Sequence, residues 1–246
     1  MGFQDASGRR LSYDSYLHLR ELLDLQQGLT EAHDELLFIV VHQVYELWFK
    51  VLIDELESVR TAIEAEELRV ARHALNRVKV IEDLLVEQVA VLETMAPQDF
   101  LTFRSELAPA SGFQSVQFRE IEFLSGLKDA GYIKAVDGEG EARARLQRRL
   151  DEPSLHDVFT VLIKRRGVTI RDLYRQGDRH ADLLELAEAL LDHDEGFRLW
   201  RLRHVEMVER QIGDKPGTGG STGVRYLQST LGKRFFPELW EVRSQL

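Results

Sequence analysis

Apolar side chains recur every three or four residues along most of this chain, which is the spacing of helices with one buried face. The longest pattern predicts a buried helix from Asp34 to Ile63, and the next predicts a helix from about Val70 to Met95. Later patterns predict helices over residues 98–107, 113–124, 154–164 and 181–212. No segment alternates apolar and polar residues as a strand does, so the sequence predicts an all-α, single-domain helical bundle over residues 1–246.

Two features interrupt this apolar pattern. Gly196 lies inside the last predicted helix and predicts a kink or a junction there. Residues 128–149 are polar and include the run VDGEGEARARLQRR. We predict that they form an exposed loop and a solvated helix, and that they are the most mobile part of the chain.

A glycine-rich segment, Gly213 to Gly223, holds five of the 17 glycines and precedes a short helix and the tail FFPELWEVRSQL. Such loops bind phosphate in nucleotide-binding folds, where the loop follows a strand. Here a helix precedes the loop and no GK[ST] sequence follows it. We therefore expect an ordered loop whose backbone approaches some other group closely.

Composition narrows the classes of partner. The chain has 42 acidic and 32 basic residues, a formal net charge of -10, so a nucleic-acid partner is not expected. The longest purely apolar run, Leu36 to Val41, is far shorter than the roughly 20 residues of a membrane span. The first residues, MGFQDASGRRLSY, contain no apolar signal core. We expect a cytoplasmic protein with no membrane partner.

The chain contains no cysteine, which excludes disulfides, thiolate metal ligands and a thiolate nucleophile. A bound metal must use histidine, aspartate or glutamate, and the chain has eight histidines. None of them follows an acid by three residues, as a di-iron helical bundle requires. The HExxH motif of zinc enzymes and the GxSxG motif of serine hydrolases are also absent from the sequence.

Two histidines lie within strongly apolar helical patterns. Each shares a stripe with apolar and mostly aromatic residues: His42 with Phe38, Tyr45 and Phe49, and His204 with Phe197, Trp200 and Val208. Each could face an aromatic cavity that holds a flat cofactor, but spacing alone favours a core histidine bonded to a carbonyl. The other six lie among charges and are predicted to be surface or local hydrogen-bonding residues: His18, His33, His73, His156, His180 and His193.

Arg104 follows Phe100 and Phe103 at helical spacing, so the two rings should bury its aliphatic stem. Such an arginine suits capture of a carboxylate, although a salt bridge to a nearby glutamate is the default expectation.

Four segments carry a resemblance to a known family: HDELLFIVVHQVYELWFK from His33, PQDFLTFR from Pro97, PASGFQSVQFREIEFLSG from Pro109 and FRLWRLRHVEMVERQIGDKPGTGGSTGVRYL from Phe197. They are similar to the tryptophan 2,3-dioxygenase family, the tetrameric haem enzymes that open the indole ring, and they follow the order of that family. The resemblance implies an all-α bundle that encloses a haem b. Between residues 126 and 196 the chain is shorter than we expect of the family.

The resemblance assigns roles around the haem. His204 matches the proximal ligand of the iron, and Trp200, Gly217 and Gly219 are expected beside the cofactor. His42 matches the distal histidine that faces the substrate indole, and is the expected catalytic residue.

Further matches concern the substrate. Phe38 matches the phenylalanine that faces the indole, and Arg104 matches the arginine that binds the carboxylate of the substrate. Phe100 lies where some members carry tyrosine. Thr218 matches the threonine that contacts the ammonium and carboxylate groups.

Tyr13 and Tyr16 match tyrosines that in this family reach the site of a neighbouring subunit. Residues 1–30 are therefore expected to pack on a neighbour within a homotetramer.

The implied function is insertion of dioxygen into the indole ring of L-tryptophan to give N-formylkynurenine. One alternative is a related haem monooxygenase of secondary metabolism that acts on a tryptophan derivative or another aromatic amino acid. A haem-binding sensor or a structural helical protein is a third hypothesis, but such a protein has no use for an amino-acid clamp formed by Arg104 and Thr218.

Overall fold

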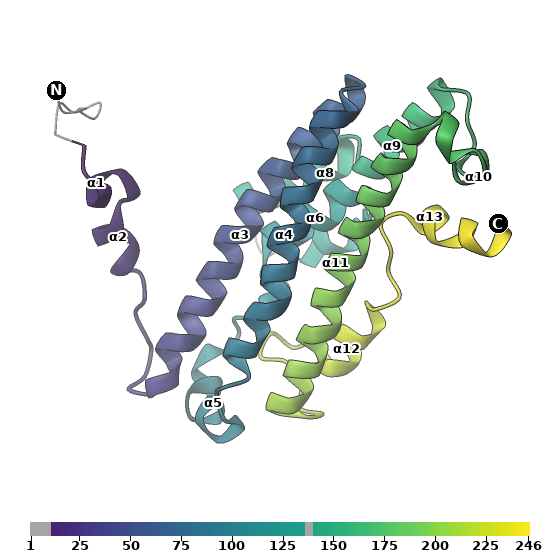
Figure 1. Ribbon diagram of the computed structural model, residues 1–246. Coiled ribbons are helices and arrows are strands. Elements are labelled where there is room, and N and C mark those ends of the chain that lie inside the picture. Colours follow the sequence, from purple (N-terminus) through teal and green to yellow (C-terminus); the bar gives the residue numbers. More distant parts are fainter. Residues whose placement is uncertain (1–10, 136–139) are drawn as a thin grey trace.

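The computed structural model describes residues 11–135 and 140–246, and every regular element in these ranges is a helix, which confirms the predicted all-α fold. Three long helices lie side by side and form the body of the protein: α3 (His33–Glu64), α4 (Leu68–Leu92) and α11 (Ala181–Ile212) (Figure 1). Their bounds lie within three residues of the predicted ones, because each long apolar pattern corresponds to one continuous buried face.

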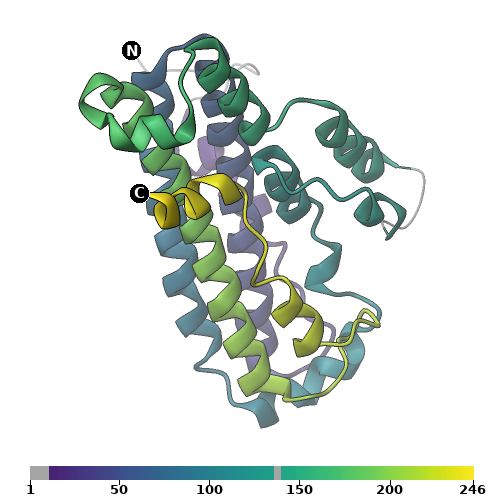
Figure 2. The same ribbon diagram turned by 90° about the vertical axis from the view of Figure 1, so that its right-hand side faces the viewer.

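Shorter elements surround these three helices. Seven of the shorter helices belong to the main body: α5 (Pro97–Phe103), α6 (Val116–Ser125), α7 (Gly131–Ala135), α8 (Glu141–Asp151), α9 (Leu155–Arg165), α10 (Ile170–Arg175) and α12 (Val224–Ser229). The N-terminal segment adds α1 (Tyr13–Leu17) and α2 (Leu19–Leu23), and the C-terminal tail adds α13 (Pro237–Glu241). Single 3-10 turns are η1 (Arg104–Leu107), η2 (Gly112–Gln114), η3 (Gly177–Arg179) and η4 (Val242–Gln245). Figure 2 shows the helices between residues 116 and 151 to one side of the long helices.

The hydrophobic core lies where the three long helices meet. Leu52 and Leu56 of α3, Val78 of α4 and Leu186 and Leu190 of α11 have no exposed surface. Burying a side chain of this size stabilises the fold by about 1.5–3 kcal/mol. Since the packing is close, truncating Leu56 to alanine should cost about 2–5 kcal/mol.

α11 is continuous from Ala181 to Ile212, so the junction predicted at Gly196 is wrong. The glycine instead allows α4 to approach α11. A Cβ atom at position 196 would lie 2.6 Å from Oε2 of Glu82, whose carboxylate occupies that space. Glycine here is a requirement of packing between helices and does not break the helix.

The prediction of a solvated helix within residues 128–149 is correct for the outer face of α8, where most of its residues are exposed, but it misses a buried face. α8 packs against α6, and it buries Leu146 completely and leaves Arg149 only 3% exposed. Leu146 belongs to a small apolar cluster with Phe123, Tyr132 and Ile133. The predicted mobility includes residues 136–139, which lie outside the described residues.

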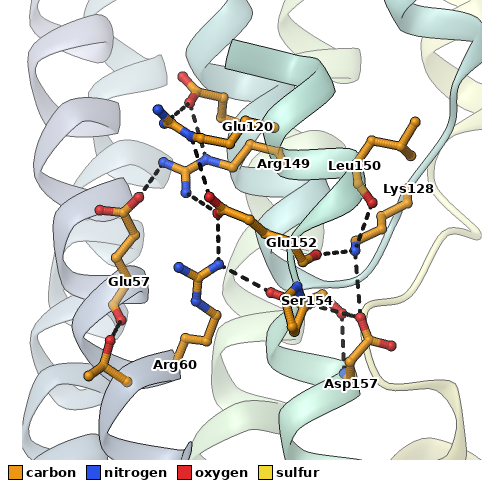
Figure 3. A network of polar contacts seen from close by, with 12 residues as sticks. Glu57, Arg60, Glu120, Lys128, Arg149, Leu150, Glu152, Ser154 and Asp157 are labelled. Atoms are coloured by element: carbon orange, nitrogen blue, oxygen red, sulfur yellow. Dashed lines mark hydrogen bonds and ion pairs between the residues drawn. The ribbon is translucent and has the colours of Figure 1, made fainter. Parts of the chain in front are cut away.

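Acids from other helices compensate the buried arginine of α8. Arg149 pairs with Glu120 of α6 at 3.2 Å, with Glu57 of α3 at 2.5 Å and with Glu152 at 3.5 Å (Figure 3). Arg60 of α3 reaches the same Glu152 at 3.0 Å. Glu57 and Glu120 come from distant parts of the sequence, so the polar pattern of α8 does not by itself predict that Arg149 is buried.

His193 is fully buried, so it is not the surface histidine that its neighbours in sequence predict. Its Nδ1 lies 2.7 Å from Oε1 of Glu82 in α4, and its Nε2 lies 2.9 Å from Oγ of Ser125 in α6. The ring also stacks on Phe235, with 5.0 Å between the ring centroids. His193 therefore joins three helices in the interior.

The N-terminal segment extends away from the body of the protein (Figure 1). Tyr13 and Tyr16 are 77% and 68% exposed, and several leucines of the same segment are exposed too. The segment is tied to α3 where the Gln26 side chain donates to Gln43 at 2.6 Å.

α3 also has an apolar surface outside the core. It is the one helix in the described ranges that is long and apolar enough to cross a membrane by length and composition. One face of it packs on α4, α6 and α9. Its outer face carries four apolar side chains that are between 37% and 56% exposed: Leu36, Val40, Leu47 and Val51.

Candidate active site

One cavity of about 510 Å³ opens between α3, α5, α6, α11 and the glycine-rich loop. Of the eleven residues that the sequence analysis gives a role at the site, eight line it: Phe38, His42, Phe100, Arg104, Trp200, His204, Gly217 and Thr218. Three others do not contribute to the wall: Tyr13, Tyr16 and Gly219. The volume suits a bound organic molecule, since ligand cavities are typically about 300–1,000 Å³.

His42 lies on the cavity face of α3 and is fixed by its own helix. Its Nδ1 lies 2.7 Å from the carbonyl oxygen of Phe38, and a carbonyl only accepts, so Nδ1 carries the proton. The Phe38 ring lies against the imidazole, with 4.1 Å between centroids. Enclosure by protein atoms lowers the pKa of His42, and the Phe38 carbonyl and Glu46 oppose this effect. His42 is therefore neutral at pH 7, with Nε2 left as a hydrogen-bond acceptor.

His204 lies on α11 and lines the same cavity. Its ring stacks on Trp200, with 5.1 Å between centroids and an interplanar angle of 11°. Burial, with a smaller repulsion from His42, lowers the pKa of His204 to about 4. No hydrogen bond to either ring nitrogen occurs within residues 11–135 and 140–246. A neutral imidazole with free nitrogens is competent to bind a metal.

His204 has no cluster of metal-ligating side chains around it in the described ranges. Among the described residues, no group of three or more histidine, aspartate and glutamate side chains could hold a metal ion. A porphyrin supplies four nitrogen ligands of its own, so one axial histidine on an aromatic wall fits haem iron.

Arg104 ends α5, and its Nη2 donates to the carbonyl oxygen of Pro216 at 2.5 Å. No carboxylate in the described parts of the chain pairs with it, so the expected salt bridge to a nearby glutamate is wrong. The guanidinium keeps further N–H donors for a ligand of the cavity. The Phe100 ring lies 5.6 Å from the Phe38 ring and 5.4 Å from the fully buried Phe103 ring, which gives the cavity an aromatic wall.

The glycine-rich loop makes the close approach that the sequence predicts, and its neighbour is the segment before η2. Thr218 Oγ1 donates to the carbonyl oxygen of Ala110 at 2.6 Å. A Cβ atom at Gly219 would lie 2.6 Å from Cβ of Ser111, so only glycine fits there. Gly219 therefore shapes the loop, whereas Gly217 and Thr218 face the cavity.

Sequence reasoning missed several polar residues of the wall. Glu46 follows His42 by one helical turn, and its carboxylate accepts from Ser115 Oγ at 2.6 Å and from Gln117 Nε2 at 2.7 Å. Arg119 of α6 and Arg201 of α11 also line the cavity. Arg201 precedes His204 by three residues on the same helix face, which is a signal that the sequence does contain.

Sequence comparison with known proteins agrees with this geometry. The tryptophan 2,3-dioxygenase family profile matches residues 1–156 and 159–246. A tryptophan 2,3-dioxygenase of Nocardioides sp. is 50% identical over 97% of this chain and 96% of its own length. Those of Caulobacter vibrioides and Anaeromyxobacter sp. are 42% and 43% identical, over 96% and 98% of this chain and 98% of each relative. With its near full-length match and its paired cavity histidines, the chain belongs to the tryptophan 2,3-dioxygenase family.

Proposed function

We propose that this protein is a haem-dependent dioxygenase that converts L-tryptophan and dioxygen into N-formylkynurenine. The observation that carries the proposal is one cavity with two neutral histidines, an arginine that no carboxylate pairs with and a threonine at its wall. This combination suits a flat cofactor together with a zwitterionic aromatic amino acid.

His204 would hold the iron, and Trp200, stacked on it, would support the macrocycle. When bound, haem supplies the activation of dioxygen, which no side chain provides. The low pKa of His204 keeps the imidazole free to act as a ligand at neutral pH.

The other wall residues would bind and orient the substrate. The free N–H donors of Arg104 would bind the carboxylate, and Thr218 would contact the polar end of the amino acid. Phe38 and Phe100 offer apolar faces to the indole. Nε2 of His42 would accept a hydrogen bond from the indole N–H and so hold the ring in one orientation.

The exposed N-terminal segment supports a homotetramer in which Tyr13 and Tyr16 reach the cavity of a neighbouring subunit. Both rings are well exposed, although tyrosines usually bury much of their surface. The exposed outer face of α3 offers a further apolar surface for subunit packing.

A single-turnover experiment tests the proposal. The ferrous protein is mixed with tryptophan without oxygen, and isotopically labelled dioxygen is then added. Mass spectrometry should detect N-formylkynurenine with both labelled oxygen atoms. A hydroxylated or oxindole product with one labelled atom would favour the monooxygenase alternative. A colourless protein after haem supplementation would contradict every haem-based function.

A further inference from the structure

Glu46 ties the helix that carries His42 to the start of α6. Its Oε1 accepts from Ser115 Oγ at 2.6 Å, and its Oε2 accepts from Gln117 Nε2 at 2.7 Å. Gln117 Nε2 also donates to the backbone carbonyl oxygen of Glu46 at 2.8 Å. These contacts join one turn of α3 to residues that lie 69 and 71 positions further along the chain.

The same carboxylate helps to fix where α6 begins. Ser115 is the N-cap of α6, and its Oγ accepts from the backbone N–H of Phe118 at 3.2 Å. Because the Ser115 hydroxyl donates its one proton to Glu46, its lone pairs remain available to the helix N-terminus. Both side chains that donate to the carboxylate are neutral, and no ion pair reaches it within the described ranges. Hydrogen bonds to a charged acceptor are stronger than those between neutral groups, so the contact is firm.

Residues 110–117, which we call the wall segment, continue from this contact to the glycine-rich loop. The first six residues of the wall segment all line the cavity. At its far end, the carbonyl oxygen of Ala110 accepts from Thr218 Oγ1 at 2.6 Å. The backbone of Gly219 lies so close to Ser111 that no side chain would fit between them. The wall segment therefore connects α3 with the loop that carries Thr218.

Two parts of the site have to be held at a fixed separation. His42 faces the ring end of an amino acid, whereas Arg104 and Thr218 face its polar end. No hydrogen bond joins His42 directly to either residue in the part of the chain that the structure describes. The contact between the rings of Phe38 and Phe100 also links α3 with the helix of Arg104, but apolar contacts fix no direction.

We propose that Glu46 is a positioning residue of the site. It holds the wall segment, and with it the glycine-rich loop, at the distance from His42 that a bound amino acid requires. Glu46 thereby sets the affinity for the carboxylate and ammonium end of the substrate without touching it. This inference rests on the dioxygenase function proposed above.

Two ligands separate positioning from a general disturbance of the cavity. Tryptophan uses both ends of the site, whereas 3-methylindole has the ring but no carboxylate or ammonium group. Each is titrated without oxygen into the ferrous, haem-loaded full chain, and the haem spectrum reports binding, so no turnover is needed. Glu46→Ala should weaken tryptophan binding about three- to thirtyfold and change the affinity for 3-methylindole by less than about twofold. Glu46→Gln keeps one acceptor oxygen for two donors and should lose less affinity for tryptophan.

The same link can be cut from its other side. Gln117→Met removes the amide donor, and Gln117 does not line the cavity, so this variant leaves the wall itself unchanged. It should show the same selective loss of tryptophan affinity. In a Thr218→Ala background, Glu46→Ala should have a smaller effect than in the wild-type chain, because the contact that it positions is already absent.

Glu55→Gln is the matched control. Glu55 lies on the same helix, pairs with Arg77 of α4 and does not line the cavity. This variant should bind both ligands as the wild-type chain does, even if its stability falls.

An equal loss of affinity for tryptophan and 3-methylindole in Glu46→Ala would overturn the inference. Unchanged tryptophan affinity in Gln117→Met would overturn it as well, and this result decides alone if the Glu46 variants do not fold. In either case the wild-type chain still binds tryptophan, so the proposed function would stand. A wild-type chain that binds haem but not tryptophan would contradict the proposed function itself.

Discussion

Two histidines of one helix show how different environments give one side chain opposite roles. His193 and His204 both lie on α11, three turns apart. His193 has no exposed surface, and both of its ring nitrogens have partners, Glu82 and Ser125. His204 faces the cavity, and neither of its nitrogens has a partner in the part of the chain that the structure describes. The satisfied histidine joins helices, whereas the unsatisfied one is available to a ligand.

The burial of a polar side chain does not by itself show whether that side chain supports the fold or binds a ligand. A buried polar group without a partner is unfavourable in a closed core, so proteins rarely retain one. At a cavity wall the same group gains its partner when the ligand binds. The guanidinium groups of Arg149 and Arg201 repeat this contrast, since three carboxylates surround the first and only one faces the second.

The largest expected effect comes from removing the free imidazole. His204→Ala should abolish haem retention or weaken it by more than about a hundredfold, because the axial ligand is lost. The fold should remain, since His204 makes no hydrogen bond within the described ranges. The measurement is the haem content of the purified variant beside its helical circular dichroism. Full haem retention would show that another residue binds the iron.

For His193, whose ring nitrogens both have partners, we expect a substitution to lower the stability of the fold. His193→Ala leaves the buried Glu82 carboxylate without its partner, which should lower the free energy of unfolding by about 3–5 kcal/mol. Urea unfolding of the haem-free protein measures this loss. His193→Gln keeps a donor near Glu82 and should recover part of the stability. A fall below about 1 kcal/mol for the alanine variant would mean that the pair contributes little to the fold.

Arg104→Leu tests whether an arginine without a carboxylate partner also acts on a ligand. The variant should retain haem and bind tryptophan more weakly by about 2–5 kcal/mol, because the substrate carboxylate loses its charged partner. Tryptophan titration of the ferrous protein, followed by the haem spectrum, measures the affinity. Unchanged affinity would assign Arg104 to holding the glycine-rich loop at Pro216.

Sequence alone predicted the long helices and singled out eight of the residues that line the cavity. The three long helices α3, α4 and α11 could be predicted because each has one apolar face of helical period. Their bounds could be placed without knowing which helix packs against them. His42 and His204 were singled out by their aromatic stripes. The resemblance to the family, and not the spacing, favoured the cavity over a buried core position.

What sequence missed depended on contacts between distant segments. His193 lies among charged neighbours, and the Glu82 that pairs with it is 111 residues away. Leu146 and Arg149 lie in a polar run, but α6 and α3 supply the apolar surface and the acids that bury them. Such partners are brought together only by the fold, so no local pattern predicts them.

The smallest expected effect is a dependence of the free energy of unfolding on pH that arises from His204. In the haem-free protein the pKa of His204 is about 4, whereas an unfolded chain has an ordinary histidine pKa near 6.5. Below pH 6.5 the unfolded state therefore binds a proton that the folded state does not. Stability contributed by the neutral ring is complete above pH 6.5 and is lost as the pH falls toward 4.

The loss should be on the order of 1–3 kcal/mol, and His204→Phe should remove it because phenylalanine does not titrate. Urea unfolding of both haem-free proteins at pH 7 and pH 4.5 measures how much stability each one loses. The difference between the two losses is due to His204, since every other titrating group is common to both proteins. Equal pH dependence in the two proteins would mean that the His204 ring is already solvated in the haem-free state. The environment of His204 would then become dry only when a ligand fills the cavity.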